Sequence, residues 1–137
     1  MALLVDSGPL YAYADEDDRA HAGSLELLEM HSGPLLVPVL CITEVAYLIE
    51  SRLGAEAQVR FLGDLASGAL IPEPVAAVDW LRIAELVWQY RDLSLGTVDA
   101  AVVAAAERLG VKTIATLDHR HFGVVAPNHV ESFELLP

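Results

Sequence analysis

The sequence contains one cysteine, few basic residues and no long apolar run. Its single cysteine, Cys41, rules out an internal disulfide and fits a cytosolic compartment. Cys41 lies in an apolar run, where a buried structural thiol is the expected role. No apolar run reaches the ~18 residues that a membrane span needs, and no basic segment precedes the first apolar residues as in a secretory signal. We therefore expect a cytoplasmic protein without a membrane-spanning segment.

The shortage of basic residues makes the chain strongly acidic. Eight Lys and Arg residues against 20 Asp and Glu residues give a formal net charge of -12 at pH 7, and Lys112 is the only lysine. A protein with this charge is not drawn to nucleic acid by electrostatics alone. We therefore expect no direct DNA binding by this chain. Any binding of RNA requires metal ions or a basic partner that makes the local electrostatic potential less negative.

The chain is long enough for one domain with a sizeable core, spanning residues 1–137, and 54% of its residues are hydrophobic. Short apolar segments predict strands at 2–5, 35–37, 69–71, 111–115 and 130–136. Longer amphipathic segments predict helices at 7–13, 19–30, 38–53, 55–67, 75–90 and 97–109. This alternation predicts an α/β fold, with a mainly parallel central sheet of four to five short strands and helices on both faces.

Several residues mark the expected ends of these elements. Pro38 fits the first turn of a helix that stops at Gly54. Thr97 is a candidate N-cap. The acidic run at residues 15–18 is expected to form a solvated turn.

Four acidic residues stand out because their sequence neighbours are apolar. Asp6 and Asp118 each close an apolar segment at the carboxyl end of a predicted strand. Glu44 and Asp99 are each the only charged residue in a long apolar stretch that is predicted to be helical or to open a helix. Carboxylates are almost never fully buried unless something pairs with them. These four acids therefore need a cation.

The predicted positions of these acids suit a metal-binding site. Ligands of open α/β sheets bind at the carboxyl ends of the strands, where Asp6 and Asp118 lie. Asp99 falls in the first turn of a helix, which favours negative charge, and Glu44 projects from a helix middle. Converging carboxylates repel one another and suit Mg²⁺ or Mn²⁺. Phosphoryl transfer uses such a cluster, because the metal activates water and neutralises charge on the phosphate.

Four short motifs occur in order along the chain: Leu-Val-Asp6-Ser7, Thr43-Glu44-Val45 with Tyr47, Thr97-Val98-Asp99-Ala100, and Ile114-Ala115-Thr116-Leu117-Asp118 with Phe122. None is specific alone. Together, in this order and spacing, they resemble the PIN-domain ribonucleases, in particular the VapC-type toxins of bacterial type II toxin–antitoxin pairs. The resemblance covers essentially the whole chain.

The resemblance implies an endoribonuclease that depends on Mg²⁺, with Mn²⁺ able to substitute, and that cleaves single-stranded or structured RNA of the tRNA or rRNA class. In-line attack of water on a phosphate would leave a 3′-hydroxyl and a 5′-phosphate. The family's catalytic and metal-binding acids match Asp6, Glu44, Asp99 and Asp118. Ser7 and Thr116 match positions whose hydroxyl supports the carboxylates or the bound water.

The resemblance also implies partners. It predicts a cognate VapB-like antitoxin, whose tail would cover the helices after Ser7 and after Arg19, and a homodimer. Trp80 and Trp88 lie eight residues apart on one predicted helix. We expect them in the core or on a surface that faces a partner.

Each acid also has a simpler explanation. Asp6 could cap a helix, and Glu44 could lie on the solvent-exposed face of a helix. Asp99 could be an acid that stabilises the first turn of a helix, and Asp118 could be the first residue of a turn. The case for a site rests on all four together.

Other polar residues near these motifs are weaker candidates. His119, Arg120 and His121 follow the last acid and are candidates for contacts with RNA phosphates. Two histidines two residues apart are a weak zinc signal. Asp92 is expected to be a loop or capping residue.

Two other functions remain open from the residues. A phospho-acceptor signalling domain also has acids at strand ends, but it needs a nearby lysine, and Lys112 begins a predicted strand instead of ending one. A non-catalytic PIN-like binding module would keep the scaffold without the chemistry. The intact acids argue against it.

Overall fold

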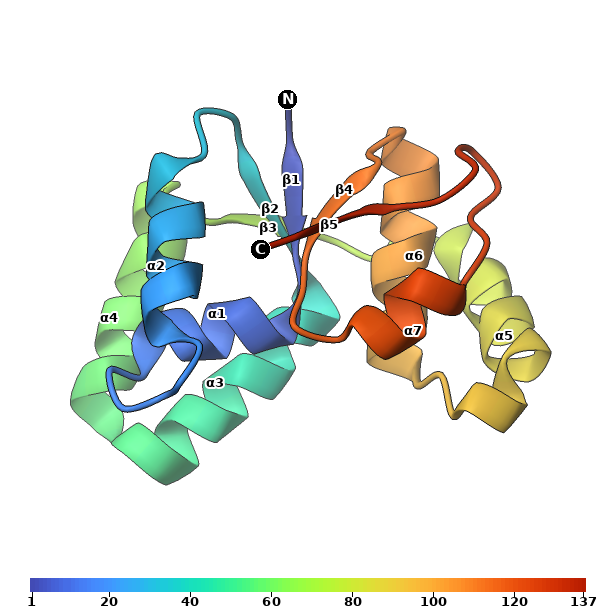
Figure 1. The fold of residues 1–137 in the computed structure, drawn as a ribbon. Helices are drawn as coiled ribbons and strands as arrows, with labels where there is room; N and C mark the ends of the chain where they lie inside the picture. The colour runs from blue at the N-terminus through green and yellow to red at the C-terminus, as the bar shows by residue number, and fades with distance from the viewer.

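Five short parallel strands form the centre of the molecule, in the computed structural model that describes residues 1–137 (Figure 1). The strand order is β3-β2-β1-β4-β5, and every neighbouring pair is parallel. The strands are β1 (Leu3–Val5), β2 (Leu35–Pro38), β3 (Ile71–Glu73), β4 (Thr113–Ala115) and β5 (Glu134–Leu136).

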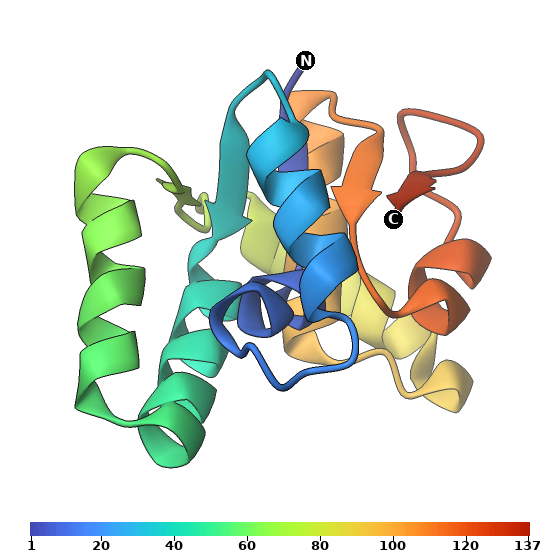
Figure 2. The same ribbon diagram turned by 60° about the vertical axis from the view of Figure 1, so that its left-hand side comes forward.

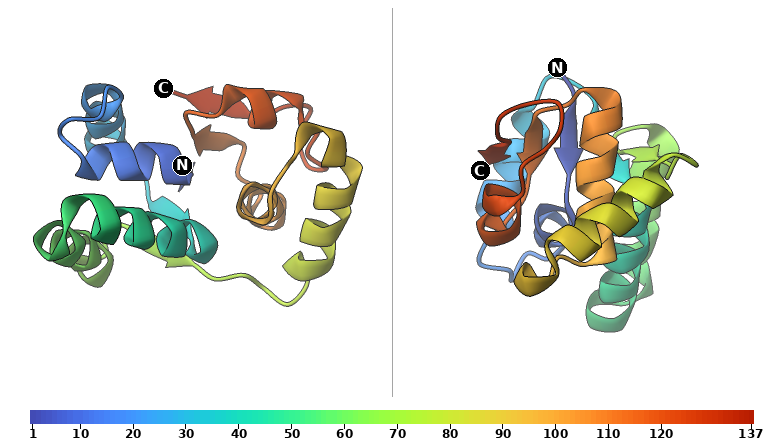
Figure 3. Two further views of the ribbon diagram at one scale, coloured as in Figure 1. Left: turned by 90° about the horizontal axis from the view of Figure 1, so that it is seen from below. Right: turned by 90° about the vertical axis from the view of Figure 1, so that its right-hand side faces the viewer.

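Seven α-helices surround this sheet. They are α1 (Ser7–Ala14), α2 (His21–Met30), α3 (Val39–Leu53), α4 (Ala55–Ser67), α5 (Asp79–Gln89), α6 (Thr97–Leu109) and α7 (His119–Val124), with one 3₁₀ turn, η1 (Arg91–Leu93). Helices α4 and α6 lie on one side of β1, and α2 and α7 lie on the other (Figure 3, right). This arrangement confirms the predicted α/β fold with helices on both faces. None of the helices combines the length and the apolar character needed to cross a membrane.

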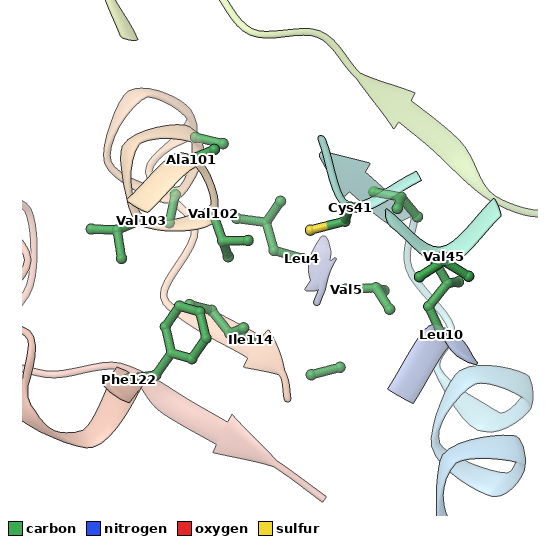
Figure 4. Close-up of a cluster of buried hydrophobic side chains, with 14 of the residues drawn as sticks. Leu4, Val5, Leu10, Cys41, Val45, Ala101, Val102, Val103, Ile114 and Phe122 are labelled. Atoms are coloured by element: carbon green, nitrogen blue, oxygen red, sulfur yellow. The ribbon is translucent and has the colours of Figure 1, made fainter. Parts of the chain in front are cut away.

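The core lies between β1, β4 and α6. All three residues of β1 are fully buried, as expected for the middle strand of a sheet covered on both faces. Helix α6 is buried along residues 100–106, because it is enclosed between the sheet and α5. In Figure 4, Val102 of α6 lies beside Leu4 of β1, and Phe122 of α7 lies beside Ile114 of β4.

The third strand lies two residues later than the sequence predicts. We expected a strand at 69–71 that stops before Pro72, whereas β3 (Ile71–Glu73) contains this proline. Proline lacks an N–H and is therefore tolerated only where a strand has a free edge. Strand β3 is the edge of the sheet, so the prediction was wrong for a reason that only the strand order reveals.

The start of α5 and the N-cap of α6 also differ from the prediction. Helix α5 begins at Asp79, not at residue 75, because the Asp79 carboxylate accepts a hydrogen bond from the Ala76 N–H at 2.9 Å and holds the preceding residues in a turn. Asp79 is also paired with Arg108 at 3.1 Å. Gly96, not Thr97, is the N-cap of α6. Pro38 ends β2 and is the N-cap of α3, one residue before the first turn in which it was predicted. Gly54, at φ +88°, ends α3 as predicted.

The carboxyl edge of the sheet gathers several helix starts. Helices α1, α3, α6 and α7 all begin at this edge, which faces the viewer in Figure 3 (left). Helices α1 to α4 pack together on the left of β1 in Figure 1, and α5 to α7 lie on its right; Figure 2 shows the same two groups from another side. Strands β1 and β4 are neighbours, with Val5 opposite Ala115. The residues that follow these two strands therefore meet at one place.

Candidate active site

Asp6 is the buried acid of this edge. Its side chain is only 5% exposed, and its N–H donates to the Ala115 carbonyl at 2.9 Å, which ties the end of β1 to β4. The Thr116 hydroxyl donates to Asp6 Oδ2 at 2.9 Å. Burial raises the pKa of Asp6 to about 6, despite the opposing hydrogen bonds from the Ser7 N–H and Thr116. The negative charges of Asp99 and Glu44 add to the rise.

Asp99, Asp118 and His121 form a second, more accessible group, which we call the outer triad. His121 Nδ1 lies 2.8 Å from Asp99 Oδ2 and 2.9 Å from Asp118 Oδ2. Asp99 lies in the first turn of α6, and Asp118 caps α7 by accepting the His121 N–H at 3.0 Å. Burial raises the pKa of Asp99, and the contact with His121 opposes this rise. The triad therefore joins the starts of two helices.

Thr116 connects Asp6 to the outer triad. Its hydroxyl donates to Asp6 Oδ2 and accepts the Asp118 N–H, each at 2.9 Å, and its side chain is fully buried. This geometry supports the predicted role of Thr116 as a hydroxyl that orients the carboxylates. Ser7, the other predicted hydroxyl, is also buried, but its Oγ has no hydrogen-bond partner in the chain.

Replacing Thr116 with Val is expected to destabilise the protein. Valine fills nearly the same space but removes both the donor to the buried Asp6 carboxylate and the acceptor of the Asp118 N–H, and the loss of these hydrogen bonds costs about 1–3 kcal/mol. The free energy of unfolding, measured by urea denaturation, checks this. Thr113→Val is the matched control, because the Thr113 hydroxyl makes only a long contact of 3.4 Å with Glu134 on the surface. Equal losses in the two variants would contradict the bridging role.

Glu44 departs from the expectation that all four acids are drawn into the core. It is exposed on α3, next to the exposed residues Thr43 and Tyr47, so it lies on the wet face of the helix. Its charge still raises the pKa of both Asp6 and Asp99, which places it close to them. Glu44 therefore stands at the rim of the site.

His121 is the residue that sequence reasoning missed. It was expected only as a contact for RNA phosphates, whereas the structure places its ring between two carboxylates. The spacing of the two residues could have indicated this position. An aspartate that caps a helix accepts the N–H of the residue two or three positions later, so His121 is held beside Asp118. His119, Arg120 and Asp92 are exposed. Helix α7 itself replaces the turn expected after Asp118.

The acids of the site have no strong base to neutralise them. The ion pairs of the arginines involve other acids, among them Arg82 with Glu107 at 2.7 Å and Arg108 with Asp79 at 3.1 Å. Lys112 precedes β4 and therefore lies at the opposite edge of the sheet, which removes the lysine that a phospho-acceptor domain needs. Clustered oxygen donors without a basic partner suit a divalent cation. The ligand atoms of the outer triad lie within 4.8 Å of one another.

Comparison with known proteins defines the class to which this fold and site belong. Residues 3–126 match the PIN domain, so the chain belongs to the PIN-domain family, and within it to the VapC-type ribonucleases. The second part of this assignment rests on Ribonuclease VapC26 of Mycobacterium tuberculosis. The two sequences are 33% identical over 135 residues, which cover 98% of this chain and 100% of the relative.

Solved structures show the same fold. VapC20 of Mycobacterium tuberculosis, described as a toxin that cleaves the sarcin-ricin loop, superposes with a TM-score of 0.83 at 19% identity, over 93% of this chain and 98% of that one. VapBC2 from Rickettsia felis, solved with a DNA fragment from its promoter, gives 0.69 at 15% identity over 98% and 97% of the two chains. FitAcB from Neisseria gonorrhoeae gives 0.64 at 13% identity over 98% and 96%.

Proposed function

We propose that this chain is the toxin of a toxin–antitoxin pair and hydrolyses a phosphodiester bond in structured or single-stranded RNA with the help of Mg²⁺, for which Mn²⁺ can substitute. One observation carries the proposal. Asp6, Asp99 and Asp118 meet at the carboxyl edge of the sheet with no Lys or Arg partner. A chain of the VapC type with this arrangement has the charge needed to hold a divalent ion against a phosphate.

The residues have distinct roles in this proposal. Asp99 and Asp118 would hold the ion, with Asp6 and Glu44 completing the negative site. The bound ion would neutralise charge on the phosphate and lower the pKa of a water molecule. Thr116 fixes the orientation of the Asp6 carboxylate through its 2.9 Å hydrogen bond. Glu44 is exposed at the rim and is free to orient the attacking water, whose in-line attack leaves a 3′-hydroxyl and a 5′-phosphate.

Cleavage of RNA is expected to depend on added metal. We expect Mg²⁺ or Mn²⁺ to support cleavage, EDTA to abolish it and excess metal to restore it, because without the cation the carboxylates repel the phosphate. Total tRNA and rRNA, the expected substrate classes, serve as substrates, and sequencing of the new ends checks for 5′-phosphates. Undiminished cleavage in EDTA would contradict the metal mechanism. No cleavage with either metal would favour the non-catalytic binding module.

A cavity between α1, α2 and α4 supports the antitoxin partner. It has a volume of about 710 Å³ and is lined by residues of both signs and by apolar side chains, including Tyr13, Leu25, Arg60, Phe61 and Asp64. We propose that the tail of a VapB-like antitoxin occupies it. The net charge of -12 favours a basic partner. Co-expression with the product of the adjacent gene, followed by co-purification, tests this.

The outer face of α5 supports the proposed homodimer. Trp80, Leu81 and Trp88 are exposed by 52%, 70% and 68%, so the tryptophans are not in the core. Arg91 stacks on Trp88, with its guanidinium 4.0 Å from the ring centre. An apolar patch of this kind is typical of a protein–protein interface.

A further inference from the structure

The imidazole of His121 is positioned as a metal ligand, a role that the acidic motifs of the sequence do not assign. We propose that His121 Nδ1 binds the divalent ion directly, together with Asp99 and Asp118, and that this nitrogen donor favours Mn²⁺ over Mg²⁺. The inference rests on the proposed function, because it names a further ligand of the same metal site. It also predicts which of the two ions the site prefers.

The hydrogen bonds of the ring identify which nitrogen faces the site. His121 Nε2 lies 3.1 Å from the Leu93 carbonyl oxygen, which can only accept, so Nε2 carries a hydrogen. In the neutral ring the lone pair is then on Nδ1, which points at Asp99 and Asp118. Histidine ligands of metals usually donate their other N–H to a carbonyl or carboxylate in this way. The Leu93 carbonyl thus sets the tautomer that ligation requires.

The spacing of the donor atoms also fits a single ion. Octahedral coordination at about 2.0–2.1 Å places neighbouring ligand atoms about 2.9 Å apart. The distances from His121 Nδ1 to the two carboxylate oxygens are 2.8 Å and 2.9 Å. The same spacing suits hydrogen bonds when Nδ1 is protonated, so an ion that replaces the proton needs a turn of the ring but little change in these two distances. Side-chain exposures of 17% to 37% in the triad leave room for solvent to reach the ion.

The choice of metal follows from the donor set. Mg²⁺ strongly prefers oxygen ligands, whereas an imidazole suits first-row transition ions. A site of two carboxylates and one imidazole therefore binds Mn²⁺ more tightly than Mg²⁺. Asp6 is more deeply buried and already bonded to Thr116, so it is not one of the three closest donors.

Pulsed EPR of the full chain loaded with Mn²⁺ tests the ligand directly. Nitrogen-14 of a coordinated imidazole modulates the Mn²⁺ electron spin echo, and labelling with ¹⁵N-histidine changes the modulation without altering the protein. We expect a histidine signal in the unaltered chain. We expect it to vanish in His121→Gln and to persist in His119→Gln, a matched control on the same helix with an exposed ring. By calorimetry, His121→Gln should weaken Mn²⁺ binding at least about 10-fold, and Mg²⁺ binding less.

The outcomes separate this inference from the proposed function. Specific Mn²⁺ binding without a histidine signal, or with a signal that persists in His121→Gln, would overturn the role of His121 and leave the metal-dependent nuclease intact. Equal weakening of Mn²⁺ and Mg²⁺ in His121→Gln would overturn the selectivity. Failure of the unaltered chain to bind either ion would overturn both proposals. The isotope experiment needs no variant, so a His121→Gln protein that fails to fold does not prevent the test.

Discussion

Replacing Asp99 with Asn is expected to lower the rate of RNA cleavage by more than about 100-fold in Mg²⁺ while the protein stays folded. Loss of a group that only supports a metal ligand typically costs 10- to 100-fold, and Asp99 is proposed as a ligand itself. Asparagine has the same shape but no negative charge, so the effect isolates the charge. Single-turnover cleavage of a defined RNA, with folding followed by circular dichroism, measures it.

Asp92→Asn is the matched control for this experiment. Asp92 lies in η1, close in sequence to Asp99, and its side chain is exposed and makes no hydrogen bond or ion pair within the chain. The same change of charge there should leave the cleavage rate within about 2- to 3-fold of the unaltered protein. Undiminished cleavage by a folded Asp99→Asn protein would show that the acids at the sheet edge are not the catalytic site.

Replacing Asp6 with Asn should stabilise the metal-free protein at high pH. Burial raises the pKa of Asp6 from 3.8 to about 6, and each unit is worth about 1.4 kcal/mol, so the ionised carboxylate costs about 3 kcal/mol. Asparagine removes that cost while its carbonyl oxygen can still accept the Thr116 hydroxyl. In EDTA at pH 8 we therefore expect the variant to have the higher free energy of unfolding, measured by urea denaturation.

The gain should depend on pH in a defined direction. Because the folded-state pKa is raised, protonation of Asp6 stabilises the unaltered protein as the pH falls through about 6, and this stabilisation is complete below 3.8. The advantage of Asp6→Asn should therefore be about 3 kcal/mol above pH 7 and shrink towards zero near pH 4. Asp17→Asn, at an exposed position, is the control and should show no such trend. A gain that is the same at pH 8 and pH 4.5 would refute the burial argument.

The main effect of Asp99→Asn is expected on cleavage and that of Asp6→Asn on stability, although both acids have the same apolar sequence surroundings. Repulsion among the converging carboxylates also predicts that Asp99→Asn stabilises the metal-free protein, because one like charge is removed. In the structure Asp99 contacts His121 Nδ1 at 2.8 Å, and this contact opposes the rise in its pKa. Asp6 forms no ion pair, accepts hydrogen bonds from neutral groups such as the Thr116 hydroxyl and the Ser7 N–H, and is more deeply buried. The larger gain in stability is therefore expected at Asp6.

Much of the fold could be predicted because local patterns encode it. Alternation of apolar segments and helical periodicity located all five strands and six of the seven helices, some of them shifted by a few residues. The errors occurred where distant contacts decide the local structure. Pro72 is accepted because β3 is an edge strand, and α5 starts late because Asp79 binds both its own turn and Arg108. Neither fact is visible within a short window of sequence.

By itself, the sequence determined which elements form and which side chains could carry chemistry, because secondary-structure periodicity and residue type are local properties. It pointed to Asp6, Glu44, Asp99 and Asp118 and to the family. Only the tertiary structure decided how these acids divide into a buried one, an outer pair joined by His121 and one at the rim. Thr116 reaches Asp6 across 110 residues because β1 and β4 pair. Distance and burial set the pKa of each carboxylate, and both come from packing between segments far apart in the chain.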